Sequence, residues 1–170
     1  RANPDFAGID VRRLDVTDLA AVNALVGGLA SLDYVVNSAG IIQRGAEHQP
    51  EVFDRVLDVN VSGGMRVATA ARPLLARRRG AVVFVASIMA FFGGPVQPAY
   101  SSSKGAVRNL TMSLACAYAA DGVRVNAVAP GWIASSGMDS YGGAMKAIIP
   151  RLKHHVPLRR MGLEAEVSGA

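Results

Sequence analysis

Two side chains able to exchange a proton lie one helical turn apart in the segment Tyr100-Ser101-Ser102-Ser103-Lys104. This spacing places Tyr100 and Lys104 on the same face of a helix. A phenol with a pKa of about 10 is a poor acid and a poor base at neutral pH, but a neighbouring ammonium favours the phenolate and lowers that pKa. The pair therefore predicts acid/base chemistry at Tyr100, although a solvated surface pair with this spacing is common in helices.

Small and polar residues follow each of the short β-branched runs of the chain. These residues are Asp15, the segment Asn37-Ser38-Ala39-Gly40, Ser87, and Pro130-Gly131. In an open parallel sheet, ligands bind in the crevice outside the carboxyl ends of the strands. Small residues there let a flat ligand approach the backbone, and hydroxyl, amide or carboxylate side chains can hydrogen-bond it. The sequence therefore predicts one ligand-binding crevice that collects all four segments.

The elements that must position these residues alternate between strands and helices, as is typical of βα units on a parallel sheet. The β-branched runs predict strands over residues 9–14, 32–37, 81–86 and 123–129. Apolar residues at helical spacing predict helices over residues 18–29, 50–79 and 99–120. We expect Thr17 or Asp18 to cap the first helix and Gly80 to end the second. Residues 135–143 and 146–160 break the alternation and predict a mobile lid or a substrate loop.

Composition limits the kind of protein that the chain can be. With 170 residues, 51% of them hydrophobic, the chain predicts a single domain over residues 1–170 and no second domain. Its net charge of +5 is spread along the chain, and the run Arg77-Arg78-Arg79 is expected in the last turn of a helix, facing the helix dipole. No apolar run reaches the roughly 18 residues that cross a bilayer. We therefore expect neither a nucleic-acid partner nor a membrane partner.

The Cys and His residues argue against two further kinds of site. The single cysteine, Cys116, leaves no internal disulfide, which fits a reducing, cytoplasmic location. His48, His154 and His155 lack the spacing of metal ligands. No metal site is predicted.

The order of the polar residues resembles the short-chain dehydrogenase/reductase family. Asn37-Ser38-Ala39-Gly40 resembles the Asn-Asn-Ala-Gly signature of the family, and Asp58-Val59-Asn60 contains its helical Asn. Ser87 lies 13 positions before Tyr100, and Pro130-Gly131 completes the family's order. The resemblance implies a Rossmann-like α/β fold with a doubly wound parallel sheet. It also implies transfer of a hydride between the nicotinamide of NAD or NADP and a secondary alcohol or ketone.

The resemblance covers the whole chain but only part of the family's domain. The sequence has no counterpart of the family's first strand, of its Gly-rich phosphate-binding loop or of the helix that follows, and none of its last strand. We therefore expect an incomplete sheet, and a longer polypeptide of which this sequence is a part. A non-catalytic binding protein on the same scaffold is the alternative, because the phosphate-binding loop supplies most of the cofactor affinity.

The resemblance also implies a role for each polar residue. Tyr100 is the proton donor or base, Lys104 lowers its pKa and hydrogen-bonds the nicotinamide ribose, and Ser87 holds the substrate oxygen. Asn60 holds a water that links Lys104 to solvent. The implied cofactor contacts are Asp15, Val16, Asn37, Ala39, Gly40, Tyr100, Lys104, Pro130, Gly131, Ile133 and Ser135.

The segments 40–44 and 86–94 look closest to the sugar-acid branch of the family, the deoxygluconate and gluconate dehydrogenases. An apolar wall of the substrate pocket is expected from Met89, Phe92, Trp132, Met138 and Tyr141. A cation for a substrate carboxylate is expected from Arg44, Lys146, Arg151 or Lys153, unless these form a solvated basic lid. The competing substrate is a 3-oxoacyl thioester. The resemblance further implies a homotetramer, assembled through the helices over 50–79 and 99–120.

Overall fold

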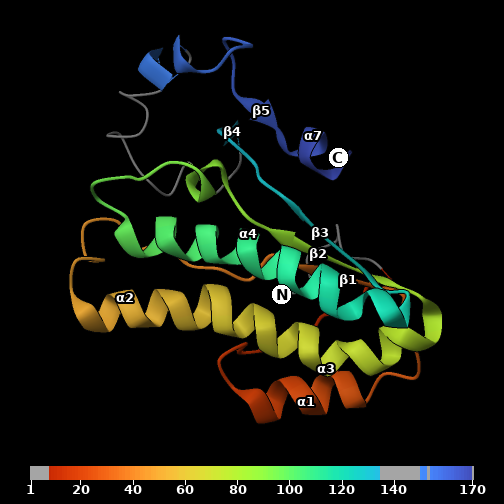
Figure 1. Ribbon diagram of the computed structural model, residues 1–170. Coiled ribbons are helices and arrows are strands. Elements are labelled where there is room, and N and C mark those ends of the chain that lie inside the picture. Colours follow the sequence, from red (N-terminus) through yellow and green to blue (C-terminus); the bar gives the residue numbers. More distant parts are fainter. Residues whose placement is uncertain (1–7, 135–149, 153, 170) are drawn as a thin grey trace.

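A three-stranded parallel sheet lies at the centre of the computed structural model, which describes residues 8–134, 150–152 and 154–169 (Figure 1). Its strands are β1 (Tyr34–Asn37), β2 (Ala81–Val85) and β3 (Arg124–Val128), in that spatial order. Tyr34 pairs with Ala81, and Val85 pairs with Val128, so the carboxyl ends of all three strands meet at one edge. Three of the four predicted strands are thus confirmed, each with slightly shorter bounds.

Helices connect these strands and cover one face of the sheet (Figure 1). The first is α1 (Leu19–Gly27), whose N-cap Asp18 accepts a hydrogen bond from Ala21 N, as the sequence predicted. The predicted helix over 50–79 is one continuous helical run with a π-helical centre, made of α2 (Pro50–Leu57), η2 (Asp58–Ser62) and α3 (Gly63–Arg78). The next is α4 (Pro98–Tyr118), which ends in the short 3-10 turn η4 (Ala119–Asp121).

The hydrophobic core lies between the sheet and this helical layer. Phe84 of β2 and Leu75 of α3 are fully buried there, and Val107 and Leu114 of α4 pack against the same cluster. On the other face of the sheet, Tyr34 and Val36 are 70% and 68% exposed. Within the described residues, therefore, one of the two helical layers of a doubly wound fold is present.

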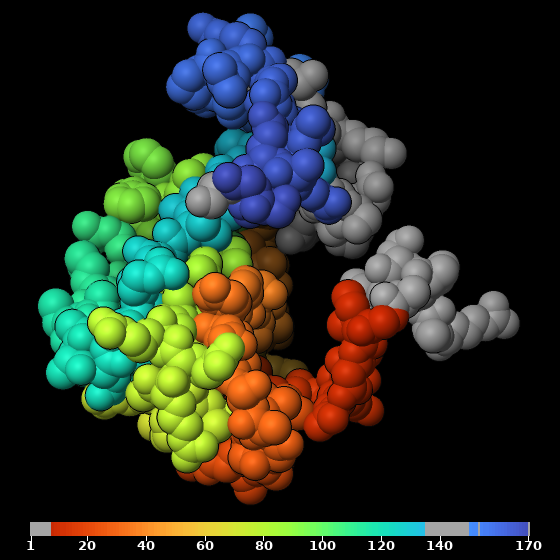
Figure 2. Space-filling model, turned by 90° about the vertical axis from the view of Figure 1, so that its right-hand side faces the viewer, coloured from red at the N-terminus to blue at the C-terminus, as the bar shows by residue number. Residues whose placement is uncertain are grey.

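The predicted strand over residues 9–14 is not a strand in the structure. Ile9 and Val11 are 60% and 72% exposed, and Figure 2 shows this segment (red) standing away from the rest of the described chain. A strand exists only when a neighbour accepts its ladder of hydrogen bonds. Within residues 8–134, β1 pairs with β2 on one edge only, so β-branched composition alone could not produce a strand here.

The end of α3 also differs from the expectation. Arg79, not Gly80, takes the left-handed conformation that ends the helix, with φ of 50°. Gly80 is needed for a different reason, because a Cβ at this position would lie 2.2 Å from Asp33 O. The close approach of two backbone segments therefore explains this glycine.

The last described part of the chain forms a small unit above the sheet edge (Figure 1). Strands β4 (Ile133–Ala134) and β5 (Gly162–Leu163) pair in parallel, and the short helix α7 (Glu164–Ser168) follows. Arg160 holds Glu166 through an ion pair of 2.7 Å, which lowers the pKa of Glu166 to about 2. The predicted lid over 135–143 lies outside the described residues, as does part of the segment 146–160.

Candidate active site

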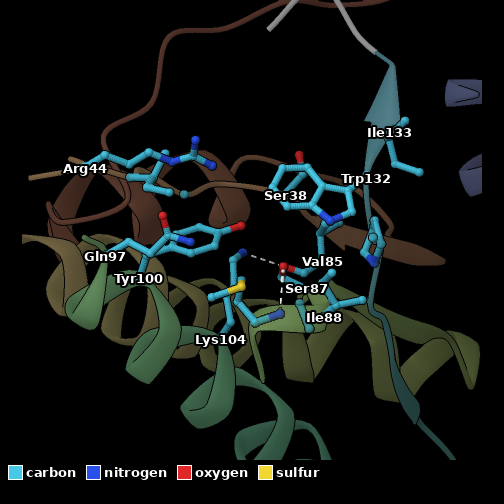
Figure 3. A pocket seen from close by; sticks show the side chains of 16 residues that line it. Ser38, Arg44, Val85, Ser87, Ile88, Gln97, Tyr100, Lys104, Trp132 and Ile133 are labelled. Carbon is cyan, nitrogen blue, oxygen red and sulfur yellow. Dashed lines mark hydrogen bonds between the residues drawn. The ribbon is translucent and has the colours of Figure 1, made fainter. Parts of the chain in front are cut away.

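A pocket of about 390 Å³ opens at the carboxyl edge of the sheet, beside the end of β2 (Figure 3). Segments after β1, β2 and β3 line it together with the first turns of α4, as the strand-end argument predicted for three of its four segments. Tyr100 and Lys104 lie on one side, Trp132 and Ile133 on the other, and Ser87 between them (Figure 3). The remaining lining residues are Ser38, Gly40, Ile42, Arg44, Val85, Ala86, Ile88, Met89, Gln97, Pro130 and Gly131.

Lys104 is a buried cation held beneath the ring of Tyr100. Its residue is only 6% exposed, and Nζ lies 5.5 Å from the Tyr100 ring centroid. Nζ donates a hydrogen bond of 2.7 Å to Val85 O, which fixes the ammonium at the pocket floor. Burial lowers the pKa of Lys104 to about 8, so the side chain is mainly protonated at neutral pH. The pair is therefore not a solvated surface pair.

Ser87 lies two positions after the end of β2 and is 9% exposed. Its Oγ accepts a hydrogen bond of 3.2 Å from Met89 N, at the start of the 3-10 turn η3 (Ile88–Ala90). Ile88 N in turn donates to Pro130 O, which joins this turn to the segment after β3. Because Ser87 acts as the acceptor in its bond to Met89, its O–H can donate to a substrate oxygen in the pocket.

Asn60 lies in the π-helical centre η2 and is 2% exposed. Its Oδ1 accepts from Ile41 N at 2.7 Å, and its Nδ2 donates to Ile41 O at 3.0 Å and to Ser103 Oγ at 2.9 Å. Ser103 Oγ then donates to Tyr100 O at 2.7 Å. The amide of Asn60 thus ties the loop after β1 to α4, and its implied role in holding a water stays a prediction.

The cofactor residues expected after β1 divide into two groups. Gly40 lines the pocket, and a Cβ at this position would lie 3.3 Å from Asn60 Oδ1 and 3.7 Å from Lys104 Nζ. Asn37 is buried, and its Nδ2 would lie 2.8 Å from a Cβ at Gly64, so it packs under the helical layer. Neither Asn37 nor Ala39 is among the lining residues.

Asp15 and Val16 do not reach this pocket. Asp15 lines a second hollow with Thr17 and Asp58, and hydrogen bonds from the Thr17 backbone and hydroxyl lower the pKa of its carboxyl. Val16 packs so closely on α3 that a Cβ at Gly63 would lie 2.6 Å from its Cγ2. The prediction of one crevice for all four strand ends is therefore wrong for Asp15, because the segment 9–14 does not join the sheet.

The expected substrate residues are also placed unequally. Met89, Trp132 and Arg44 line the pocket. Phe92 does not, because the chain turns outward after η3 and leaves this ring 65% exposed. Arg151 is exposed and is not among the lining residues. Ser135, Met138, Tyr141, Lys146 and Lys153 lie outside the described residues.

Sequence reasoning missed three residues that the structure brings to the site. Gln97 lines the pocket just before α4, Ser103 links Asn60 to Tyr100, and Glu47 accepts a hydrogen bond from Tyr100 N. Gln97 and Ser103 stood within a few residues of Tyr100, and this closeness could have identified them. Glu47 carried no such signal, since 53 positions separate it from Tyr100.

The part of the chain that the structure describes holds neither a metal-binding cluster nor a membrane-spanning helix. There, no three His, Cys, Asp or Glu side chains lie close enough together to hold a metal ion. None of the helices described is both long and apolar enough to cross a membrane.

Comparison with known proteins assigns the chain to a family. The family model described as enoyl-(acyl carrier protein) reductase matches residues 4–170. Its match extends over nearly the whole chain and includes every residue of the pocket. The chain belongs to the short-chain dehydrogenase/reductase family.

Individual relatives match different shares of the chain. The chain is 43% identical to "Inactive 2-(S)-hydroxypropyl-CoM dehydrogenase 2" of Xanthobacter autotrophicus, over 73% of this chain and 57% of that protein. It is 37% identical to 2-dehydro-3-deoxy-D-gluconate 5-dehydrogenase of Pseudoalteromonas atlantica, over 70% of this chain and 50% of that protein. The solved structure of ElxO with NADP bound superposes with a TM-score of 0.83 at 28% identity, over 93% of this chain and 67% of that one. The aligned part is thus about half the length of the two curated relatives.

Proposed function

We propose that the protein containing this chain is an NAD(P)-dependent oxidoreductase that moves a hydride between nicotinamide and a secondary alcohol or ketone. The observation that carries this proposal is the convergence of Ser87, Tyr100 and the buried Lys104 on one pocket. A carbonyl that receives a hydride must also receive a proton at its oxygen, and these side chains are the groups that such a transfer needs. Family membership and the NADP bound to the related ElxO support the same cofactor.

The residues present fit a flat nicotinamide ring. Gly40 and Gly131 line the pocket with no side chain, and a Cβ at position 40 would press on Asn60 Oδ1 at 3.3 Å and contact Lys104 Nζ at 3.7 Å. A planar ligand can therefore approach the backbone within reach of Lys104. When bound, the nicotinamide supplies or accepts the hydride. Lys104 and Tyr100 are the groups that would hold its ribose.

Proton transfer at the substrate oxygen is assigned to Tyr100. In ketone reduction its hydroxyl donates a proton to this oxygen, and in alcohol oxidation its phenolate takes the proton. The ammonium of Lys104, 5.5 Å from the ring centroid, favours the phenolate. Ser87 donates a hydrogen bond to the same oxygen and stabilises the negative charge that develops on it.

For the substrate, we propose a keto or hydroxy sugar acid. Arg44 lines the pocket above Tyr100 and Gln97 (Figure 3), where its guanidinium can pair with a carboxylate while Gln97 hydrogen-bonds hydroxyl groups. The relative from Pseudoalteromonas atlantica, by its name, acts on a sugar acid of this kind. A 3-oxoacyl thioester is the second candidate, supported by the description of the matching family and by the apolar side chains of Ile42, Met89 and Trp132 in the pocket.

Steady-state rates of the full-length protein test both the proposed reaction and the proposed substrate. The substrates are a keto sugar acid and a short acetoacetyl thioester, each with NADH and with NADPH. Arg44→Met should raise the KM for the sugar acid about tenfold or more, whereas Arg151→Met, a matched exposed arginine outside the pocket, should not. Equal or faster turnover of the thioester rejects the sugar acid. If no secondary alcohol or ketone is turned over with either cofactor, the oxidoreductase is rejected and a binding protein is favoured.

We also propose that the full-length protein is a homotetramer that associates through the continuous helical run α2–η2–α3 and through α4. Met65 on α3 and Met112 on α4 are 39% and 48% exposed, which leaves apolar side chains on the outer surface of this helical layer. Light scattering of the full-length protein at micromolar concentration distinguishes a tetramer from a monomer, and a monomer would reject this assembly.

A further inference from the structure

A buried carboxylate lies beside the proposed catalytic tyrosine. Glu47, in the loop between β1 and α2, is fully buried, although the loop itself runs over the surface. Its Oε2 accepts the backbone N–H of Tyr100 at 2.8 Å, and its Oε1 accepts the backbone N–H of Gln43 at 2.7 Å. A carboxylate removed from water is costly unless it is hydrogen-bonded. Each oxygen of Glu47 has such a bond.

The N-terminus of α4 depends on this carboxylate. Gln97, at the N-cap position, makes no side-chain capping hydrogen bond, and Pro98 follows it as the first helical residue. Tyr100 N–H, one of the amides that an α-helix leaves without an internal partner, is taken by Glu47 from 53 positions away. The negative charge also lies at the positive end of the helix dipole. Glu47 thus supplies the cap that the adjacent sequence lacks.

The other side of Tyr100 is tied to the same loop. Tyr100 O accepts from Ser103 Oγ, which accepts from Asn60 Nδ2, and Asn60 holds both the N–H and the C=O of Ile41. The backbone N–H and C=O of Tyr100 therefore both connect to the loop 41–47, one through Glu47 and the other through Asn60. These bonds form a closed frame around the tyrosine.

Further bonds join this loop to the segment before α4. Gly45 N donates to Val96 O at 2.7 Å, and His48 Nε2 donates to Pro95 O at 2.8 Å. Gly45 takes φ of 82°, a conformation that favours glycine. These two bonds end at Val96 and Pro95, before α4 begins, whereas the bond of the Glu47 carboxylate reaches Tyr100 within the helix.

We propose that Glu47 is a positioning residue: it holds the backbone of Tyr100 and the loop 41–47 as one frame, and so fixes the proton donor relative to Ser87. The frame stands on the hydrogen bonds alone, whereas its effect on catalysis rests on the proposed function. Because Arg44 belongs to the same loop, the frame also sets the distance between the cation of the pocket and the proton donor.

Amide exchange tests the frame without reference to activity. Glu47→Gln keeps the size of the side chain but turns an NH₂ group toward one of the two backbone N–H donors. Hydrogen–deuterium exchange of the full-length protein should then accelerate about tenfold or more in both segments, 41–47 and 97–103. Glu51→Gln, which alters an exposed carboxyl in the first turn of α2, is the matched control and should change neither segment. Unchanged exchange over 97–103 in Glu47→Gln would overturn the proposal.

Kinetics then test positioning against a general loss of stability. Glu47→Gln should lower kcat about tenfold and leave the KM values for NAD(P) and substrate within about twofold, because the tyrosine is displaced while the pocket remains. In a Tyr100→Phe background, the same substitution should leave the residual rate unchanged. A similar loss in that background, or a loss that matches the fraction unfolded by circular dichroism, contradicts a positioning role of Glu47.

If Glu47→Gln does not fold, Glu47→Asp, which keeps the charge on a shorter side chain, takes its place in both experiments. A wild-type protein without dehydrogenase activity would reject the proposed function, and the exchange experiment would still decide the frame.

Discussion

Lys104 holds a positive charge in a buried position, and this charge should reduce the free energy of unfolding at neutral pH. Burial lowers the pKa of Lys104 from 10.5 to about 8 in the folded protein, in which the residue is 6% exposed. One pKa unit corresponds to about 1.4 kcal/mol, so the difference between the folded and unfolded states is worth about 3 kcal/mol. Below pH 8 Lys104 is protonated in both states, and burying its charge lowers the free energy of unfolding by the full amount of about 3 kcal/mol. Between about pH 8 and 10.5 the unfolded chain still binds the proton that the folded protein has released, so the free energy of unfolding rises with pH.

Urea denaturation of the wild type and of Lys104→Met at pH 7 and pH 10 measures this contribution. Over this interval the wild type should gain about 2.5 kcal/mol relative to the variant. The hydrogen bond from Nζ to Val85 O, at 2.7 Å, can be made by the charged and by the neutral amine, so its loss affects both pH values similarly. Lys104→Arg is the control, because guanidinium does not titrate in this range and its profile should follow that of Lys104→Met. Parallel profiles of the wild type and Lys104→Met would refute a buried, titrating Lys104.

Other substitutions test the site directly in the full-length protein. Tyr100→Phe removes the proton donor but leaves Lys104 to hold the ribose, so ketone reduction should fall about a hundredfold or more while the Kd for NAD(P), measured by fluorescence titration, changes only a few-fold; a retained rate above about a tenth contradicts the acid/base assignment. Ser87→Ala should lower kcat about a hundredfold, with a small change in the KM for the cofactor, because its hydrogen bond strengthens as charge develops on the substrate oxygen; a change confined to KM would instead indicate ground-state binding. Gly40→Ala would bring a methyl group within 3.3 Å of Asn60 Oδ1 and 3.7 Å of Lys104 Nζ, so the Kd for NAD(P) should rise at least tenfold while Gly27→Ala, with nothing near its Cβ, leaves it unchanged.

The sequence by itself was sufficient to predict the local features of this protein, which are the positions of its main helices and strands and the spacing of its site residues. Alternating β-branched and helical patterns located β1, β2, β3 and the helices, because the period of apolar residues is set within each element. The spacing of four placed Tyr100 and Lys104 on one face of α4, and the strand-end rule brought Ser87 to the same pocket. These conclusions depend on neighbours along the chain, which a single sequence displays.

Only the tertiary structure decided the features that depend on residues far apart in the sequence. The segment 9–14 has the composition of a strand but finds no neighbour among the described residues, and Asp15 consequently lies away from the main pocket. The burial of Lys104, which shifts its pKa, results from the packing of α4 against β3 and η3, which brings Nζ to Val85 O, rather than from its position in the helix. Glu47 and Tyr100 are joined across 53 positions by one hydrogen bond. No periodicity encodes such a bond, because its geometry exists only after the loop and the helix have packed together.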